Sequence, residues 1–97
     1  MYLEELDITV EELSSEAINS LGLDSKTSGI LVKEVGDKNE NLLNNDVIIQ
    51  VSSEKIKDIS SFQSMIANSI KLNRDKLLLR VIRDGNEFWL INPFVIE

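Results

Sequence analysis

A chain of 97 residues is long enough for one domain with a modest core, and its 42% hydrophobic and 28% charged residues are typical of a soluble globular protein. Acidic residues outnumber basic ones by 17 to 10, and the resulting charge of −7 argues against nucleic acids and anionic membranes as partners. The sequence contains neither histidine nor cysteine, which excludes Ser-His-Asp and Cys-His catalysis, thiolate zinc sites and disulfides.

The first residues do not have the composition of an export signal. Residues 1–5 include no basic region followed by an apolar stretch. No apolar run approaches the roughly 20 residues that a membrane-spanning helix needs. Because no complete catalytic apparatus is visible either, we expect residues 1–97 to be a single domain of a longer protein.

Short elements are predicted in the first half of the chain. Apolar and polar residues alternate over residues 6–10, which is typical of a half-buried strand. A short helix is expected over residues 14–21, with a serine as its N-cap and Gly22 at its end. Runs rich in β-branched residues predict buried strands over residues 30–35 and 46–51, joined by a polar, Asn-rich loop.

The second half predicts a helix followed by a hairpin. A serine N-cap and an apolar stripe indicate a helix over residues 61–70. Strands over residues 76–83 and 87–94 flank Asp84-Gly85, a strong signal for a two-residue turn, and Pro93 should lie at an edge or end the pairing. The order of elements predicts an α+β fold, a small and partly open barrel of mainly antiparallel strands with two helices.

Three segments, in order along the chain, carry a resemblance to a known family. They are residues 28–35 (SGILVKEV), residues 45–59 (NDVIIQV followed by IKDI) and residues 77–85 (LLLRVIRDG). Together with the lead-in LDITVEEL, they resemble the PDZ domains of the HtrA/Do family of serine proteases. Because the chain stops shortly after its last strand, it resembles the C-terminal PDZ domain of such a protease more than an internal one.

The resemblance implies that a peptide adds as an extra strand to the exposed edge of the strand over residues 6–10. Leu6, Ile8 and Ile66 would then form an apolar pocket for the last side chain of the ligand, so we expect an apolar terminal residue. Phe62 and Met65 would face the core. The candidate peptide-binding residues are Leu6, Asp7, Ile8, Thr9, Val10, Ile59, Gln63 and Ile66.

Ordinary packing is the alternative explanation for the same residues. Without the resemblance, the apolar residues of the first strand would simply be the inner face of a core strand. Ile59 and Ile66 would serve the core, as apolar residues at helical spacing usually do, and Gln63 would be a solvated polar residue.

The loop before the first strand departs from the family pattern. Asp7 stands where the family has a glycine, and Glu4 and Glu5 precede it. These carboxylates would repel the carboxylate of a ligand, and Asp7 lacks the freedom of glycine at positive φ. We therefore hypothesise that C-terminal peptides bind weakly, that internal segments bind instead, or that the domain mainly packs against its own protease.

The sequence is compatible to different degrees with three functions from different classes. The first is a non-catalytic module that binds peptides or unfolded segments with apolar side chains, and so recognises substrates or regulates an associated serine protease. The second is a structural module that assembles the protease into oligomers by contacting the protease domain or other subunits. The third, an independent enzyme, is disfavoured because no convergent set of reactive side chains is visible.

The remaining expectations concern ligands and setting. No cofactor, metal, nucleic acid or membrane insertion is expected from the residue content. The resemblance implies a periplasmic parent whose catalytic serine endopeptidase domain lies upstream of this chain.

Overall fold

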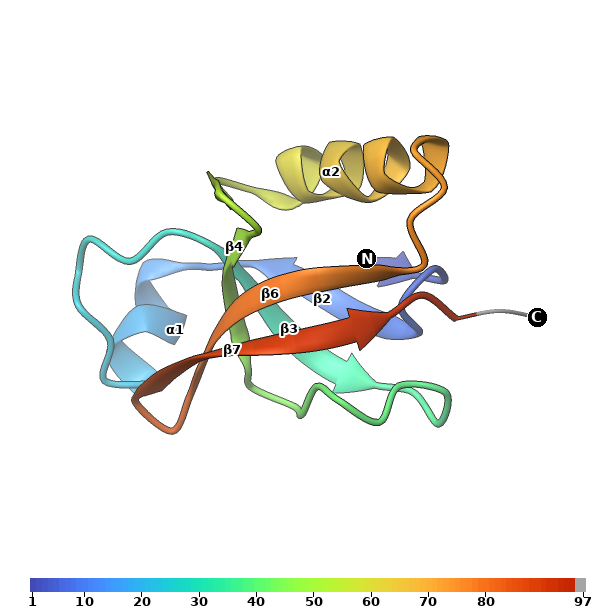
Figure 1. Cartoon of the computed structure of the whole chain (residues 1–97). Coiled ribbons are helices and arrows are strands. Elements are labelled where there is room, and N and C mark those ends of the chain that lie inside the picture. The colour runs from blue at the N-terminus through green and yellow to red at the C-terminus, as the bar shows by residue number, and fades with distance from the viewer. Residues whose placement is uncertain (96–97) are drawn as a thin grey trace.

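A sheet of seven strands forms the body of the computed structural model, which describes residues 1–95 (Figure 1). The strands pair antiparallel in the spatial order β1-β2-β3-β4-β6-β7, and β5 attaches to β4. Because β1 and β7 lie at opposite ends of this order, strand pairing does not close the sheet into a barrel. The predicted class, α+β with a small, partly open barrel of mainly antiparallel strands and two helices, is confirmed. The strands are β1 (Tyr2–Leu3), β2 (Ile8–Glu12), β3 (Ile30–Val35), β4 (Val47–Val51), β5 (Glu54–Lys55), β6 (Lys76–Arg83) and β7 (Asn86–Pro93).

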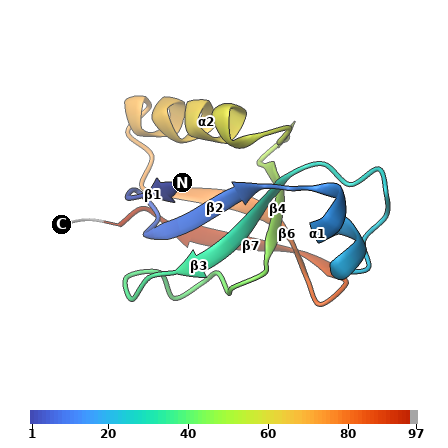
Figure 2. The same cartoon turned by 180° about the vertical axis from the view of Figure 1, so that it is seen from behind.

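One helix covers the sheet and the other lies at its end. Helix α2 (Ile59–Lys71) lies across one face, over β2 and β6, as Figures 1 and 2 show. Helix α1 (Ser15–Ser20) is a short segment after β2. Phe62 and Ile66 of α2 join the aliphatic side chains of the sheet in one buried cluster. Neither helix within residues 1–95 is long and apolar enough to cross a membrane.

The C-terminal hairpin follows the sequence prediction closely. β6 has the predicted bounds, and β7 begins and ends one residue earlier than predicted. Asp84 and Gly85 have φ angles of 51° and 79°, the left-handed pair that a type I′ turn requires. Pro93 ends β7 at the edge of the sheet, where its missing N–H costs no ladder hydrogen bond.

Helix α2 begins earlier than predicted. It starts at Ile59 rather than at Ser61, because its N-cap is Asp58 and not a serine. The Asp58 carboxylate accepts a hydrogen bond from the Ser61 N–H at 2.8 Å, and Ser61 Oγ accepts one from the Asp58 N–H at 3.2 Å. This capping box fixes the first turn of the helix. For α1 the predicted serine cap is confirmed, with Ser14 at the N-cap position.

The N-terminal strand prediction needs two corrections. β2 spans Ile8–Glu12 instead of residues 6–10, because Leu6 and Asp7 lie in a tight turn. A further strand, β1, precedes that turn and was not predicted. Two residues are too few to show an alternating pattern, so the sequence carries no periodic signal for β1.

Candidate functional site

Over residues 8–10, the edge of β2 that faces away from β3 is paired with β1, so the prediction of an open edge is wrong for this part of the strand. The two strands are antiparallel, with Leu3 opposite Ile8. The Val10 N–H donates to the Met1 carbonyl at 2.8 Å, and the Met1 ammonium donates to the Val10 carbonyl at 2.8 Å. Backbone groups that were expected to be free for a partner are therefore used within the chain.

A tight turn links β1 to β2. The Leu6 N–H donates to the Leu3 carbonyl at 3.2 Å, and the Asp7 N–H donates to the Glu4 carbonyl at 3.3 Å. Asp7 adopts a φ of 52°, the left-handed conformation that glycine takes most easily. Asp7 thus replaces the family glycine and still adopts the left-handed backbone conformation that glycine favours.

The Asp7 side chain compensates for this conformation by accepting hydrogen bonds from β1 and from the loop after β3. Its carboxylate accepts a hydrogen bond from the Tyr2 hydroxyl at 2.6 Å and another from the Lys38 N–H at 2.9 Å. These two donors hold the pKa of Asp7 below its usual value. Gly36 makes room for this arrangement, because a Cβ at that position would collide with the Asp7 carboxylate.

A buried asparagine, which was not predicted from the sequence, also holds the turn in place. Asn39 is 7% exposed, and its Nδ2 donates to the Leu6 carbonyl at 2.8 Å and to Asn92 Oδ1 at 3.1 Å. The Val95 N–H also donates to the Glu5 carbonyl at 2.8 Å. The Asn-rich composition of the loop after β3 was the only available signal, and it did not distinguish this residue from its neighbours.

The predicted pocket residues lie together, but in the core. Leu6 and Ile8 are fully buried and Ile66 is 2% exposed, and all belong to the buried cluster beneath α2. Leu3 of β1 is 3% exposed and belongs to the same cluster. Leu3 also lies opposite Ile8 in the strand register, so a side chain of β1 is buried next to one of the predicted pocket residues.

The other candidate residues differ in their burial. Val10 is fully buried, Thr9 and Ile59 are half-buried, and Gln63 is exposed on α2. Phe62 faces the core as predicted, while Met65 is only partly buried against it.

The far end of the space between β2 and α2 is bridged by one hydrogen bond. Glu12, the last residue of β2, accepts the N–H of Ile59 at 2.9 Å through its Oε1 atom. The carboxylate thus stabilises the first turn of the helix, where unpaired N–H groups favour negative charge. This hydrogen bond connects the start of α2 to the end of β2.

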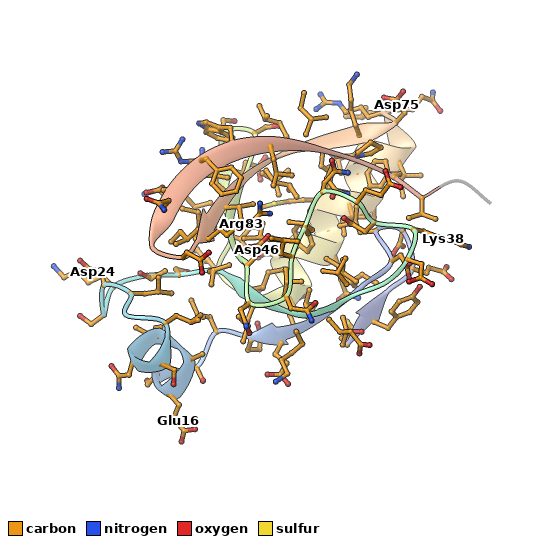
Figure 3. All side chains as sticks on the ribbon, turned by 90° about the horizontal axis from the view of Figure 1, so that it is seen from below. Glu16, Asp24, Lys38, Asp46, Asp75 and Arg83 are labelled. Atoms are coloured by element: carbon orange, nitrogen blue, oxygen red, sulfur yellow. The ribbon has the colours of Figure 1, made fainter. Side chains whose placement is uncertain are left out.

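A buried ion pair lies away from this site, between the entry to β4 and the end of β6 (Figure 3). Asp46 is 1% exposed, and its carboxylate accepts hydrogen bonds from Arg83 Nε at 2.9 Å and from Nη2 at 2.7 Å. Asp46 raises the pKa of the Arg83 guanidinium by this contact. Asn45, with a φ of 73°, takes the left-handed position before it. Within residues 1–95, no group of acidic side chains is arranged to hold a metal ion.

Comparison with known proteins gives a match in structure but not in sequence. No protein-family model matches the chain, and no curated protein matches it. By contrast, 31 chains of solved structures match this chain. One is the crystal structure of the HtrA3 PDZ domain bound to a phage-derived ligand, FGRWV, with a TM-score of 0.69 and 21% identity over 92% of this chain and 83% of that one. The chain has the PDZ fold.

The fold match bears on how the predicted residues are arranged. PDZ domains bind an extended peptide as an added strand on a sheet edge, with pockets for alternate side chains. In this chain the strand covered by β1 and lying under α2 is β2, which contains three of the residues predicted for binding. The fold predicted from the three sequence segments is thus confirmed, and the turn of residues 4–7 lies at the end of β2 where β1 joins it.

Proposed function

We propose that this chain is a peptide-binding module that takes up an extended segment as an additional strand on β2, beside α2. The observation that carries the proposal is β1 itself. It lies antiparallel to β2, pairs with it through backbone hydrogen bonds and buries one aliphatic side chain in the core. An edge that accepts a strand of the same chain has the geometry to accept one from another chain.

The side chains around the site favour an apolar end to the ligand. Leu6, Ile8 and Ile66 offer only aliphatic surface, and burying a charge against such surface is costly. The HtrA3 ligand FGRWV ends with an aromatic residue followed by an aliphatic one. Tyr2 and Leu3 of β1 have the same order, which supports a ligand of that class for this chain.

The turn of residues 4–7 supports only weak recognition of a free carboxylate. Its Leu6 and Asp7 N–H groups already donate to carbonyls of the turn. Asp7 and Glu4 also add negative charge close to where a ligand carboxylate would lie, and like charges repel. Peptide affinity should therefore depend more on the last side chain than on the terminal charge.

Titration of the isotope-labelled protein with FGRWV, followed by amide chemical shifts, tests the proposal. We expect the shifts to concentrate in residues 8–12 and 59–66. The C-terminal amide of the same peptide should bind within about tenfold of the free acid, a difference of about 1.4 kcal/mol. FGRWD is the matched control, and it should bind at least about tenfold more weakly because its last side chain is charged. Shifts scattered evenly over the surface would contradict the proposal.

The biological setting that we propose is a protease. The support is the resemblance of three sequence segments to HtrA/Do proteases, in which such a domain would recognise substrates or regulate a serine endopeptidase in the periplasm. The sequence of the full parent protein decides this point. An upstream trypsin-like domain with an export signal is the expected result, and an unrelated parent would count against it.

A second candidate, assembly of oligomers, is favoured by one surface. Leu78, Trp89 and Ile91 are 42%, 43% and 55% exposed, and Leu78 lies opposite Ile91 on the β6–β7 hairpin. Adjacent exposed apolar side chains are typical of contact surfaces. Light scattering at increasing protein concentration tests this function. An oligomer that dissociates in the Trp89→Ser variant would support it, and a monomer at all concentrations would contradict it.

A further inference from the structure

We propose that β1 is an internal ligand of the domain, so that a peptide binds only after Met1–Leu3 has left the edge of β2. This inference rests on the proposed peptide-binding function. It differs from that function in assigning a closed state and an open state to the same site.

Leu3 has both features of the last residue of a bound peptide. Its side chain is 3% exposed and lies in the cluster that contains Ile8 and Ile66. Its carbonyl accepts the N–H of Leu6 from the turn at 3.2 Å. Backbone N–H groups of such a turn are the groups that capture a terminal carboxylate. Leu3 thus occupies at once the side-chain pocket and the carboxylate position.

The backbone of β1 uses the same groups that a peptide would use. Val10 both donates to and accepts from Met1, at 2.8 Å in each case. One edge of a strand can pair with only one neighbour, at about 4.8 Å. A peptide and β1 are therefore mutually exclusive partners of β2, and the apparent affinity for peptide is reduced by the fraction of molecules in which β1 is released.

The same contacts suggest that β1 leaves without unfolding of the domain. It pairs with β2 at two register positions, and both Met1 and Tyr2 are 58% exposed. Beyond the backbone bonds, its contacts include the buried Leu3 side chain and the Tyr2 hydroxyl on Asp7 at 2.6 Å. Few buried contacts are typical of segments that open locally at low cost.

The first test weakens β1 by substitution. In Leu3→Asp, a charged side chain replaces the buried anchor, and Leu3→Met is the matched control that keeps an apolar one. For Leu3→Asp without peptide, we expect the Val10 N–H to exchange faster with solvent while the amides of β6 stay protected. We also expect FGRWV to bind at least about tenfold more tightly to Leu3→Asp than to the unchanged chain, and Leu3→Met to remain near the unchanged chain.

The second test locks β1 in place and does not depend on how well Leu3→Asp folds. Met1 and Val10 exchange both hydrogen bonds, so the next pair, Tyr2 and Thr9, is a non-hydrogen-bonded pair with Cα atoms about 4.5 Å apart. That separation suits a disulfide in the double variant Tyr2→Cys/Thr9→Cys, and the chain has no other cysteine. The oxidised form should bind FGRWV at least about tenfold more weakly than the reduced form of the same protein.

The outcomes separate this inference from the proposed function. Equal peptide affinity in the oxidised and reduced forms, with shifts in residues 59–66, would overturn the internal ligand and leave the binding function standing. A Leu3→Asp protein that exposes the Val10 N–H and still binds neither FGRWV nor its amide would overturn the binding function, and the inference with it.

Discussion

The two ends of the sheet are specified by the chain in different ways. At one end, the β6–β7 hairpin pairs two strands of one continuous segment, and its turn is formed by Asp84 and Gly85 in the left-handed conformation. At the other end, the β1–β2 turn depends on distant residues, because Asn39 and Val95 hold its carbonyls and the Lys38 N–H holds the Asp7 side chain. Local chemistry is enough for the first end, whereas the second forms only when the rest of the fold is in place.

The same difference separates scaffold from site. The hairpin contributes fully buried side chains such as Leu79 and Val81 to the core, and its ladder runs over its whole length. At the N-terminal end, the contacts of β1 include the buried Leu3 side chain and a surface hydrogen bond from the Tyr2 hydroxyl. A segment that must exchange with a partner is expected at the weakly held end, where opening costs least.

The largest expected effect comes from the same substitution made at both ends. Leu79→Ala should lower the free energy of unfolding by about 3–4 kcal/mol, because Leu79 is fully buried in a central strand and leaves a cavity. Leu3→Ala should cost only about 1–2 kcal/mol, since β1 can detach instead of leaving a void under the intact structure. Urea denaturation measures both values, and equal losses would show that β1 is an integral part of the core.

How much could be predicted from the sequence follows the same division. The bounds of β6, the hairpin turn and the serine cap of α1 depend on neighbours in the chain, and all were correct. The cover on β2 was not predictable, because β1 has no periodic pattern and its stability comes from contacts with residues far along the sequence. The candidate residues Leu6, Ile8 and Ile66 all belong to the buried cluster, and periodicity could not show that Leu3 belongs to it as well.

The next effect sharpens the comparison within the hairpin itself. Arg83 pairs with the buried Asp46 and lies over the Phe88 ring at 4.9 Å, and Arg80 pairs with the exposed Glu87 in an otherwise similar arrangement. Arg83→Met should cost about 2–3 kcal/mol, because it leaves a carboxylate buried without its counter-charge.

Arg80→Met is the matched control for this pair. Its partner is exposed to solvent, so we expect a loss of about 0.5 kcal/mol. Thermal unfolding of the two variants side by side gives the difference, and a loss at Arg80 as large as that at Arg83 would refute the role assigned to burial.

A smaller effect is expected from the asparagine that joins the turn to the rest of the sheet. Asn39→Ala leaves the Leu6 carbonyl and the Asn92 side chain without their donor, so the free energy of unfolding should fall by about 1–2 kcal/mol. Amide exchange in β2 should rise in this variant before exchange in β6 does. Uniform loss of protection along the chain would indicate that the turn and the hairpin form one cooperative unit.

The smallest effect concerns the charge of Asp7 and depends on pH. Hydrogen bonds from Tyr2 and from the Lys38 N–H lower the pKa of Asp7 in the folded protein, so in the pH range just below the usual carboxyl pKa of about 4 the unfolded chain binds more protons than the folded one. The stabilisation from the Asp7 carboxylate is therefore complete above that value and is lost as the pH falls through the lowered pKa. In Asp7→Asn, which keeps an oxygen acceptor and tolerates the left-handed backbone, this contribution is absent at every pH.

The difference in unfolding free energy between the unchanged chain and Asp7→Asn should thus shrink from pH 6 to about pH 3. The difference between the unchanged chain and Leu79→Ala should stay constant over the same range. A constant difference for Asp7→Asn as well would mean that the carboxylate charge does not contribute to holding the turn.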